Sequence, residues 1–359
     1  MPPKNKLKVL GEGSYGCVIS HPLPCDNKET IITDKDKDKD TRKKVGKLFY
    51  DKYKYDNEVR FGKMTKKIDP SEEKILTPIS GCSVDKKAFT QPDNVNAISK
   101  CELFTSIGST DYNTESFNID QLKNKKIWQI TMPYGGTDIE KTLMNYKKHI
   151  PVRSFAKMIT PLFEAIVLLK KNKMVHQDIK LDNVLVYKRK AILIDFSLML
   201  PFSQIYTERN YKRLKRRYRP FPPEYYIASL AMKKEKYYNM RIEEIKNMDL
   251  TQQIIHRFES MQQYVYPYYT ISEFIAASNH ESLLSIALTD YKKFDNFADK
   301  IDVYSIGTTI CELDQYLDNP HNNQDYVTLM RGILHPDPRY RMTPEDAVIL
   351  CNKISSTKK

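Results

Sequence analysis

The 359-residue sequence predicts an α+β protein of two unequal parts, a small part built mainly of antiparallel strands and a larger, mainly helical part. The first part carries a glycine-rich stretch, Gly11–Val18, whose last residues continue as an apolar strand pattern. The second part opens with apolar residues at close to a 3.6-residue period through 155–169, which predicts a helix that Pro161 kinks or delays. We expect residues 1–132 to form the first part and residues 133–359 the second.

The composition fits a folded, soluble protein with a hydrophobic core, because 40% of the residues are apolar. The longest apolar run, Ala165–Leu169, is far shorter than the ~18 residues that span a bilayer, and no signal peptide is visible after Met1. The six cysteines form no CxxC pair and lack the density of a disulfide scaffold. We therefore expect no membrane association, reduced cysteines and a cytoplasmic or nuclear location.

The most informative motif is His176-Gln177-Asp178-Ile179-Lys180-Leu181-Asp182-Asn183, which is followed twelve residues after Asn183 by Asp195-Phe196-Ser197. The two segments resemble the catalytic loop and the metal-binding turn of protein kinases. A chance match within a charged surface loop is the alternative, but eight aligned positions and a correctly spaced Asp-Phe are hard to obtain by accident.

The resemblance assigns a role to each polar residue of these segments. Asp178 would accept the proton of the substrate hydroxyl, and Lys180 would reach the transferred phosphate. Asn183 and Asp195 would supply hard oxygen ligands for Mg²⁺. The pattern between them predicts a hairpin that holds both at neighbouring strand ends: Val184–Val186 and Ala191–Ile194 form the strands, and residues 188–190 form the turn.

The glycine-rich stretch resembles the kinase loop that covers the phosphates of ATP. Its members are Gly11, Gly13, Ser14, Gly16 and Val18. A generic hairpin and a dinucleotide-binding fingerprint are the alternatives. The fingerprint requires a helix to open at the third glycine, whereas this sequence continues as a strand.

Kinases also pair a strand lysine with a helix glutamate, and Lys47 with Glu58 is the best match. The gap between them is shorter than usual in the family, and Gly62 falls where an apolar side chain usually packs. Lys43 or Lys44 could be the true partner, and Lys47 could be merely solvated.

The remaining nucleotide-binding residues come from a hinge-like segment at 127–136. In the resemblance, Met132 is the gatekeeper beside the adenine pocket, Tyr134 offers backbone hydrogen bonds to the base, and Asp138 approaches the ribose. Leu185 is assigned to the same nucleotide site.

Two later matches extend the resemblance from residue 11 to about residue 350. Asp302 lies in a segment similar to the central buried helix of the larger lobe, where it would anchor the catalytic-loop backbone. Arg341 would pair with Glu224, which follows Pro222-Pro223 in the segment that lies against the peptide substrate. The resemblance thus implies a bilobal protein-kinase fold.

Departures from the family pattern carry predictions of their own. Gln177 replaces the arginine that receives an activation-segment phosphate, so we expect constitutive activity or control by a partner. Ser197 replaces a glycine, which should restrict flipping of that turn. We also expect a flexible insertion at about 25–42, because Asp and Lys alternate through 34–40 as in a low-complexity segment. We expect a helical insertion at about 225–298, because the spacing there exceeds the family's.

The formal net charge of +13 includes five positive residues within 212–217, next to the substrate segment. An acidic protein substrate is the sharper hypothesis. A nucleic-acid or targeting patch and a solvated loop are the alternatives, and no nucleic-acid-binding motif accompanies the run.

We therefore predict an ATP- and Mg²⁺-dependent serine/threonine protein kinase, since Lys180 after the catalytic aspartate is typical of that specificity. The insertions and the Lys-, Tyr- and Ile-rich composition resemble kinases of large DNA viruses. A catalytically weak or dead scaffold and a small-molecule kinase of the aminoglycoside type remain as alternatives.

Overall fold

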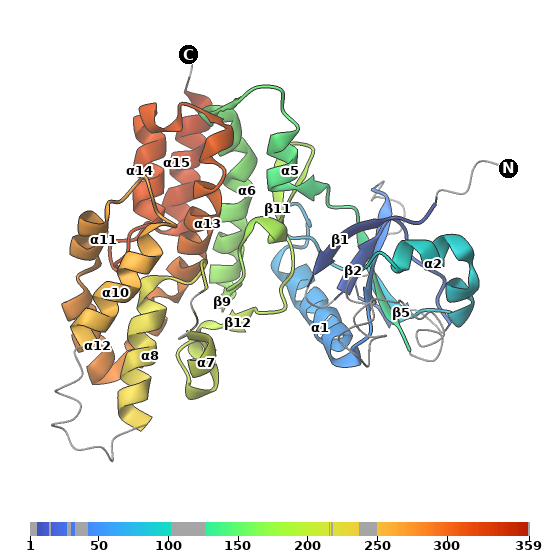
Figure 1. Ribbon diagram of the computed structural model, residues 1–359, viewed down its shortest axis with the longest axis horizontal. Coiled ribbons are helices and arrows are strands. Elements are labelled where there is room, and N and C mark those ends of the chain that lie inside the picture. Colours follow the sequence, from blue (N-terminus) through green and yellow to red (C-terminus); the bar gives the residue numbers. More distant parts are fainter. Residues whose placement is uncertain are drawn as a thin grey trace, which may run out of the picture. The chain divides into compact units, whose positions relative to one another are not determined.

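The computed structural model describes residues 6–13, 16–26, 30–32, 42–101, 126–214, 216, 218–236 and 250–357. The chain divides into two compact units, Met1–Gly135 and Gly136–Lys359 (Figure 1). Several predictions fall wholly or partly outside the described residues: those on Ser14, Lys215 and Arg217, most of the insertion at 25–42, and part of the helical insertion at 225–298.

The first unit is built on a six-stranded antiparallel sheet in the order β1-β2-β4-β6-β5-β3. Buried side chains from β2 and β4 pack with those of the helical segment after β5 to form a hydrophobic core. The elements are β1 Val9–Gly13, β2 Gly16–Ile19, β3 Thr30–Ile31, β4 Lys44–Phe49, α1 Lys52–Ile68, β5 Ser80–Ser83, α2 Pro92–Ile98 and β6 Trp128–Pro133.

Helix α1, which carries Glu58, runs without a break from Lys52 to Ile68. Asp51 caps its first turn by accepting a hydrogen bond from the Tyr53 backbone N–H at 2.8 Å. Gly62 lies on its buried face, where an added Cβ would come within 3.0 Å of Ile32 Cγ2 and 3.1 Å of Pro78. Close packing therefore explains the glycine at the position where kinases usually place an apolar side chain.

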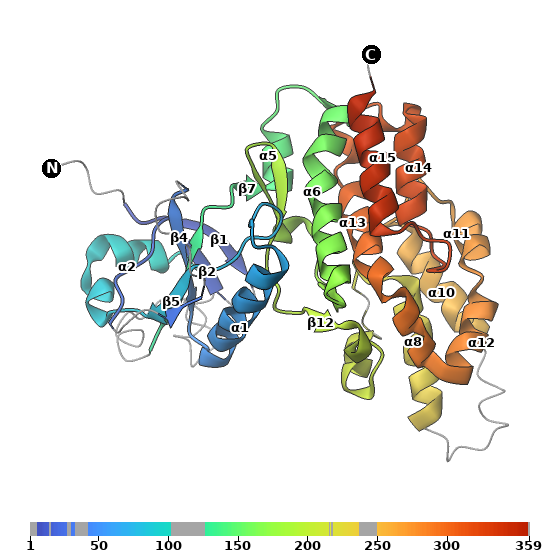
Figure 2. The same ribbon diagram turned by 180° about the vertical axis from the view of Figure 1, so that it is seen from behind.

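The second unit is mainly helical, with short strand ladders at its edge. Figure 2 shows α6, α13, α14 and α15 side by side, and α6 packs against α15 and α13. The helices are α5 Ile139–Met144, α6 Val152–Lys171, α7 Tyr211–Leu214, α8 Pro223–Lys236, α10 Leu250–Gln262, α11 Ile271–Ser278, α12 His280–Asp290, α13 Ile301–Cys311, α14 Gln324–Ile333 and α15 Pro344–Ser356. The strands are β7 Thr137–Asp138, β8 Ile150–Pro151, β9 Met174–Val175, β10 Val184–Tyr187, β11 Lys190–Leu193, β12 Leu200–Pro201 and β13 Leu317–Asp318.

Helix α6 begins before the predicted apolar pattern and continues through Pro161. The prediction of a late start is therefore wrong. Its buried positions, including Phe155, Ile159 and Ile166, follow the predicted period. This burial compensates for the backbone hydrogen bond that the proline cannot donate.

The cysteines correct one prediction. Cys17 is paired with Cys101 and Cys25 with Cys82 as disulfides, although the sequence predicts reduced thiols. The Cα atoms of the two pairs are 6.3 and 5.9 Å apart, across separations of 84 and 57 residues, so no local spacing reveals them. Within the described part of the chain, no helix is both long and apolar enough to cross a bilayer.

Candidate active site

Helix α13 anchors the segment 176–183 through hydrogen bonds. Asp302, fully buried in the first turn of that helix, accepts hydrogen bonds from the backbone N–H groups of His176 at 2.7 Å and Gln177 at 2.9 Å. Burial raises the pKa of Asp302, and these two N–H donors together with His176 oppose that rise. Thr309, two turns along the helix, donates to the Ile179 carbonyl at 3.0 Å.

The anchor explains an unusual backbone conformation. Gln177 has φ 66°, in the left-handed region that a non-glycine residue rarely adopts. Such a conformation costs about 1–3 kcal/mol and persists where the surroundings determine it. The hydrogen bond from the Gln177 N–H to Asp302 is one such constraint.

The Asp178 carboxylate lies at the centre of this segment, and both of its oxygens accept hydrogen bonds. The Asn183 amide donates to Asp178 Oδ2 at 2.9 Å and to the Asp178 backbone carbonyl at 2.8 Å. The Tyr218 hydroxyl donates to Oδ1. Lys180 is more exposed, and its Nζ lies 3.8 Å from the carboxylate of Asp182.

The hairpin predicted after Asn183 is present as β10 and β11. Lys188 and Arg189, at its tip, have φ 49° and 65°, which is typical of a two-residue type I′ turn. The Ile194 N–H donates to the Asn183 carbonyl at 3.0 Å, so the hairpin brings Asn183 close to Asp195, the residue after Ile194.

Asp195 itself adopts φ 60°, and its side chain accepts a hydrogen bond from the Ser197 N–H at 3.2 Å. The ring of Phe196 packs edge-on against His176 with centroids 4.7 Å apart. His176 Nε2 lies 3.0 Å from the Ile194 carbonyl oxygen. The positive φ falls on Asp195, and Ser197 does not adopt one.

In the first unit, Lys47 on β4 forms an ion pair with Glu58 on α1. Their side chains are 12% and 11% exposed. The two other candidate lysines, Lys43 and Lys44, are exposed. The structure therefore favours Lys47 among the three lysines weighed from the sequence.

The glycine-rich stretch forms the hairpin of β1 and β2, in which Gly13 pairs with Gly16. An added Cβ at Gly16 would lie 2.3 Å from the Leu48 backbone oxygen, which no side chain could tolerate. Gly11 lies at an irregularity in the strand register, and Val18 pairs with Lys47 across β2 and β4. The hairpin thus holds its predicted strand residues next to the lysine.

Two of the residues predicted to contact adenine and ribose make hydrogen bonds within the protein. Met132 pairs with Val45 in the sheet, but the Tyr134 N–H donates to the Lys43 carbonyl at 2.6 Å and is thus already used. Asp138 caps helix α5 by accepting from the Lys141 N–H at 2.7 Å. Leu185 pairs with Asp138 between β10 and β7.

Glu224 and Arg341 form a bidentate ion pair in the second unit, with N–O distances of 2.8 and 2.9 Å. Both side chains are fully buried. Burial lowers the pKa of Arg341, but the Glu224 charge and hydrogen bonds outweigh that effect and raise it. Arg341 also lies 4.9 Å from the centroid of the Tyr304 ring.

Among the residues of the basic run 212–217 that the structure describes, Arg213 contacts the segment 176–183. Arg213 donates to the Gln177 side-chain oxygen at 2.9 Å and to the Leu198 carbonyl at 3.4 Å. Lys212 and Arg216 are exposed. No sequence pattern singled out this contact or the Tyr218 hydrogen bond to Asp178, because both depend on how the chain folds back after β12.

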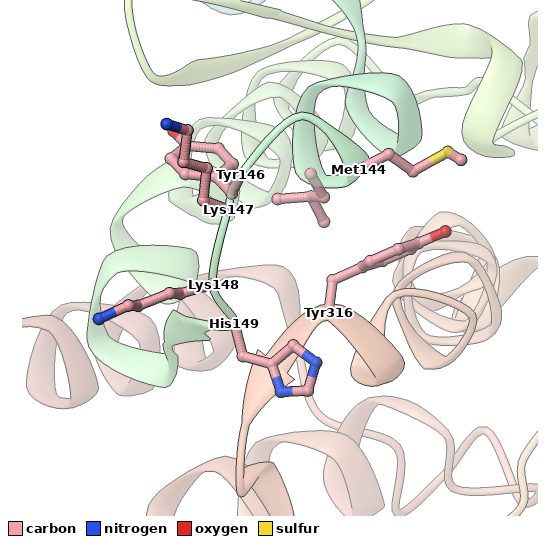
Figure 3. Close-up of a pocket in the computed structure, with 7 residues that line it drawn as sticks. Met144, Tyr146, Lys147, Lys148, His149 and Tyr316 are labelled. Atoms are coloured by element: carbon pink, nitrogen blue, oxygen red, sulfur yellow. The ribbon is translucent and has the colours of Figure 1, made fainter.

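A pocket of ≈ 340 Å³ opens elsewhere in the second unit, between the end of α5 and Tyr316 (Figure 3). Its lining includes Lys147, Lys148 and His149 but no carboxylate and none of the site residues predicted from the sequence. It therefore offers no ligand set for Mg²⁺.

Residues 114–240 match one family model. Its description is protein tyrosine and serine/threonine kinase. The matched span contains the segment 176–183, Asp195 and Glu224. No curated protein matches the chain.

The match supports a protein-kinase domain, and it agrees with the architecture. The protein has the α+β, bilobal protein-kinase fold, with a small antiparallel β-rich unit followed by a larger, mainly helical unit. The family model covers tyrosine as well as serine/threonine kinases, so the match supports transfer to a protein hydroxyl without distinguishing among the three residues.

Proposed function

We propose that this protein is an ATP- and Mg²⁺-dependent kinase that phosphorylates serine and threonine hydroxyls of other proteins. The observation that carries the proposal is the Asp178 carboxylate, hydrogen-bonded by Asn183 on a loop that the buried Asp302 anchors. Such a loop holds a proton acceptor in a fixed orientation. Catalysis of phosphoryl transfer depends mainly on this kind of positioning and on charge stabilisation, and little on covalent chemistry by the protein.

The donor set fits a magnesium nucleotide. Both N–H bonds of the Asn183 amide point to Asp178, which leaves the amide oxygen as the ligating atom. This oxygen and the Asp195 carboxylate are hard ligands from neighbouring strand ends, as Mg²⁺ prefers. Lys47, oriented by Glu58, carries the charge that would hold the nucleotide phosphates.

When bound, magnesium ATP supplies the phosphoryl group and offsets the charge that develops on it. The chain's own residues orient the acceptor and receive its proton. A serine or threonine hydroxyl donates its proton to Asp178, whose orientation Asn183 fixes through the 2.9 Å hydrogen bond. Lys180, whose side chain is 38% exposed, would approach the transferred phosphate. Its place two residues after Asp178 favours serine and threonine as acceptors.

An acidic substrate preference belongs to the same proposal. Lys212 and Arg216 are exposed cations next to the substrate segment, whereas Arg213 is engaged with Gln177. That engagement also counts against a nucleic-acid patch made of the whole run. The resemblance to kinases of large DNA viruses and the cytoplasmic or nuclear location stay predictions from the sequence.

Two observations argue against the alternative functions. A catalytically dead scaffold would be expected to lack the ion pair between Lys47 and Glu58. The structure contains this ion pair, which argues against the scaffold hypothesis. A small-molecule kinase of the aminoglycoside type has no need of a substrate-peptide segment clamped by Glu224 and Arg341, and this clamp is fully buried.

The proposal is tested with the full chain, labelled ATP, Mg²⁺ and two peptide series, one acidic and one arginine-rich. Asp178→Asn and Asp195→Ala should each lower kcat/KM by ~10²–10³ or more, because charge stabilisation at the reacting centre is worth that much. Asp182→Asn is the matched control, since Asp182 lies in the same loop and its side chain is 83% exposed. Circular dichroism should show all three variants folded.

The same assay measures the acidic preference. Wild type should favour acidic peptides by roughly tenfold, about 1.36 kcal/mol, with the advantage shrinking as salt rises. The double variant Lys212→Ala, Arg216→Ala should lose most of it. Unchanged transfer in Asp178→Asn or Asp195→Ala would refute the assignment, while equal rates on both peptide series would refute only the acidic preference.

A further inference from the structure

The glycine-rich hairpin carries a group of metal-ligating side chains that the proposed reaction does not use. Glu12 on β1 and Cys17 on β2 are directly opposite one another in the hairpin. Cys101 joins them from the segment that follows α2, 84 positions further along the chain. The ligand atoms of the three side chains, one carboxylate oxygen and two sulfurs, all lie within 4.8 Å of one another. The fold thus gathers three possible metal ligands at one point of the hairpin.

The three side chains differ in their access to solvent. Cys17 and Cys101 are 1% and 0% exposed, and both belong to the hydrophobic core of the first unit. Glu12 is exposed. A cation would therefore enter past the carboxylate and meet the two sulfurs at the closed end of the site.

The other cysteine pair has different surroundings. Among the described residues, Cys25 and Cys82 belong to no such group of three ligands. Cys25 forms a β-bridge with Val84, and the Asp26 N–H donates to the Ser83 carbonyl at 3.0 Å. Backbone hydrogen bonds therefore already hold this segment to β5, and the Cys25–Cys82 disulfide is an additional structural link.

The donor set of the group of three suits zinc. Zn²⁺ binds cysteine sulfur and carboxylate oxygen in a tetrahedral arrangement, whereas Mg²⁺ prefers oxygen ligands alone. Zn–S bonds of about 2.3 Å and Zn–O bonds of about 2.0–2.2 Å place the ligand atoms about 3.5–3.8 Å apart. The Cα atoms of Cys17 and Cys101 are 6.3 Å apart, so rotation of the two side chains allows free sulfurs to reach this spacing.

We propose that Glu12, Cys17 and Cys101 form a zinc site when the Cys17–Cys101 disulfide is reduced. A dithiol reductant supplies two electrons and becomes a disulfide itself, while the S–S bond between Cys17 and Cys101 breaks to leave two thiolates. The two protons of the dithiol pass to solvent. Zn²⁺ then binds the two thiolates and the Glu12 carboxylate, and water takes the fourth position.

The proposal agrees with the compartment predicted from the sequence. In a reducing compartment, paired cysteines more often bind a metal or take part in catalysis than form structural disulfides. The disulfide joins β2 to the segment at Cys101, and zinc would join β1 to it as well. The reduced, metal-free protein lacks both links, so zinc should stabilise it.

The experiment uses the full-length, nucleotide-free protein, reduced with a dithiol that is then removed under anaerobic conditions. Titration with Co²⁺, a spectroscopic substitute for Zn²⁺, should give a sulfur-to-cobalt charge-transfer band that saturates at one ion per chain. One equivalent of Zn²⁺ should remove the band. The protein left oxidised should show no band. Zinc should also raise the melting temperature of the reduced protein and leave that of the oxidised protein unchanged.

Three kinds of variant assign the ligands. Cys17→Ser and Cys101→Ser should each lose most of the cobalt band. Glu12→Gln should weaken zinc binding by at least about tenfold, the smallest effect usual for the loss of an outer-shell partner. The double variant Cys25→Ser, Cys82→Ser is the matched control and should keep the band. Circular dichroism checks that each variant is folded, and Glu12→Gln changes an exposed side chain outside the core.

The outcomes leave the site either supported or overturned. A reduced wild-type protein without the band would overturn it, and so would a band that persists in Cys17→Ser but disappears in the Cys25, Cys82 variant. Unchanged zinc affinity in Glu12→Gln would overturn the three-ligand site, and a full band before reduction would overturn its dependence on the disulfide. None of these measurements uses ATP or a peptide, so the zinc site and the proposed kinase function can fail separately.

Discussion

Two ion pairs, one in each unit, join a glutamate to a cation, yet they differ in almost every physical respect. Arg341 and Glu224 meet through two hydrogen bonds of 2.8 and 2.9 Å and are fully buried. Lys47 and Glu58 share one contact and keep 12% and 11% of their side chains exposed.

The difference separates a structural pair from one that can act on a ligand. A buried arginine whose donors are all committed cannot take a new partner without leaving its first one in a medium of low polarity. A lysine that keeps part of its side chain exposed is a compact charge that can turn from glutamate to phosphate with little change in solvation. The comparison predicts that one pair supports stability and the other supports activity.

The largest effect on stability should follow from breaking the buried pair. Arg341→Ala or Glu224→Ala leaves an uncompensated buried charge, so we expect the free energy of unfolding to fall by about 3–5 kcal/mol. Chemical denaturation measures it. Lys353→Ala is the control, since the Lys353 pair with Asp325 is 64% and 32% exposed and should contribute only about 0–1 kcal/mol. Equal losses in the buried and exposed variants would contradict the comparison.

The partly exposed pair should show the reverse behaviour. Lys47→Met should lower kcat/KM by roughly 10²–10³, as the loss of one electrostatic contact to the reacting group does. The free energy of unfolding should fall by about 1–3 kcal/mol, less than in the Arg341 variant, because the largely buried Glu58 loses its contact with Lys47. Lys44→Met, an exposed residue on the same strand, is the matched control. Loss of activity in Lys44→Met but not in Lys47→Met would show that the register assigned to this strand is wrong.

Sequence patterns predicted the Glu224–Arg341 pair more directly than the Lys47–Glu58 pair. Glu224 and Arg341 stand in motifs that specify them directly, and Asp302 was predicted in the same way. Lys47 had two competing neighbours, Lys43 and Lys44, and nearby lysines are distinguished only by which of them the fold buries. The β10–β11 hairpin was predicted because two short apolar runs flank turn residues at 188–190, although Lys190 belongs to β11 in the structure.

Contacts between distant segments were missed where no residue type specifies the partner. The hydrogen bond from Tyr218 to Asp178 spans 40 positions, and the one from Arg213 to Gln177 spans 36. The prediction of reduced cysteines failed for the same reason, because Cys17 pairs with Cys101 across 84 positions. The roles assigned to Asp138 and Tyr134 compete with local hydrogen bonds. The Asp138 carboxylate caps helix α5, and the Tyr134 N–H donates to the Lys43 carbonyl, so atoms expected to bind the nucleotide already have partners.

The smallest expected effect concerns Asp295, a half-buried carboxylate that, unlike Glu224, is not bonded to any arginine that the structure describes. Among the described residues, its Oδ1 is buried with no hydrogen-bond partner. Burial, with the nearby charge of Asp290, raises the pKa of Asp295 from 3.8 to about 6, and Lys292 opposes the rise only in part. Glu224, by contrast, has both oxygens engaged by Arg341.

The sign of the pH dependence follows from linkage. The folded protein holds the Asp295 proton more tightly than the unfolded chain does, so this group lowers stability as pH rises from about 4 to about 6 and adds no further loss above that range. Asp295→Asn removes that loss, and the variant should gain stability relative to wild type between pH 4 and pH 7. Melting temperatures across this range measure the difference. Asp318→Asn is the control, because Asp318 is exposed, and its melting temperature should follow that of wild type across the pH range. If the melting temperature of Asp295→Asn also follows that of wild type, Asp295 is solvated like a surface acid.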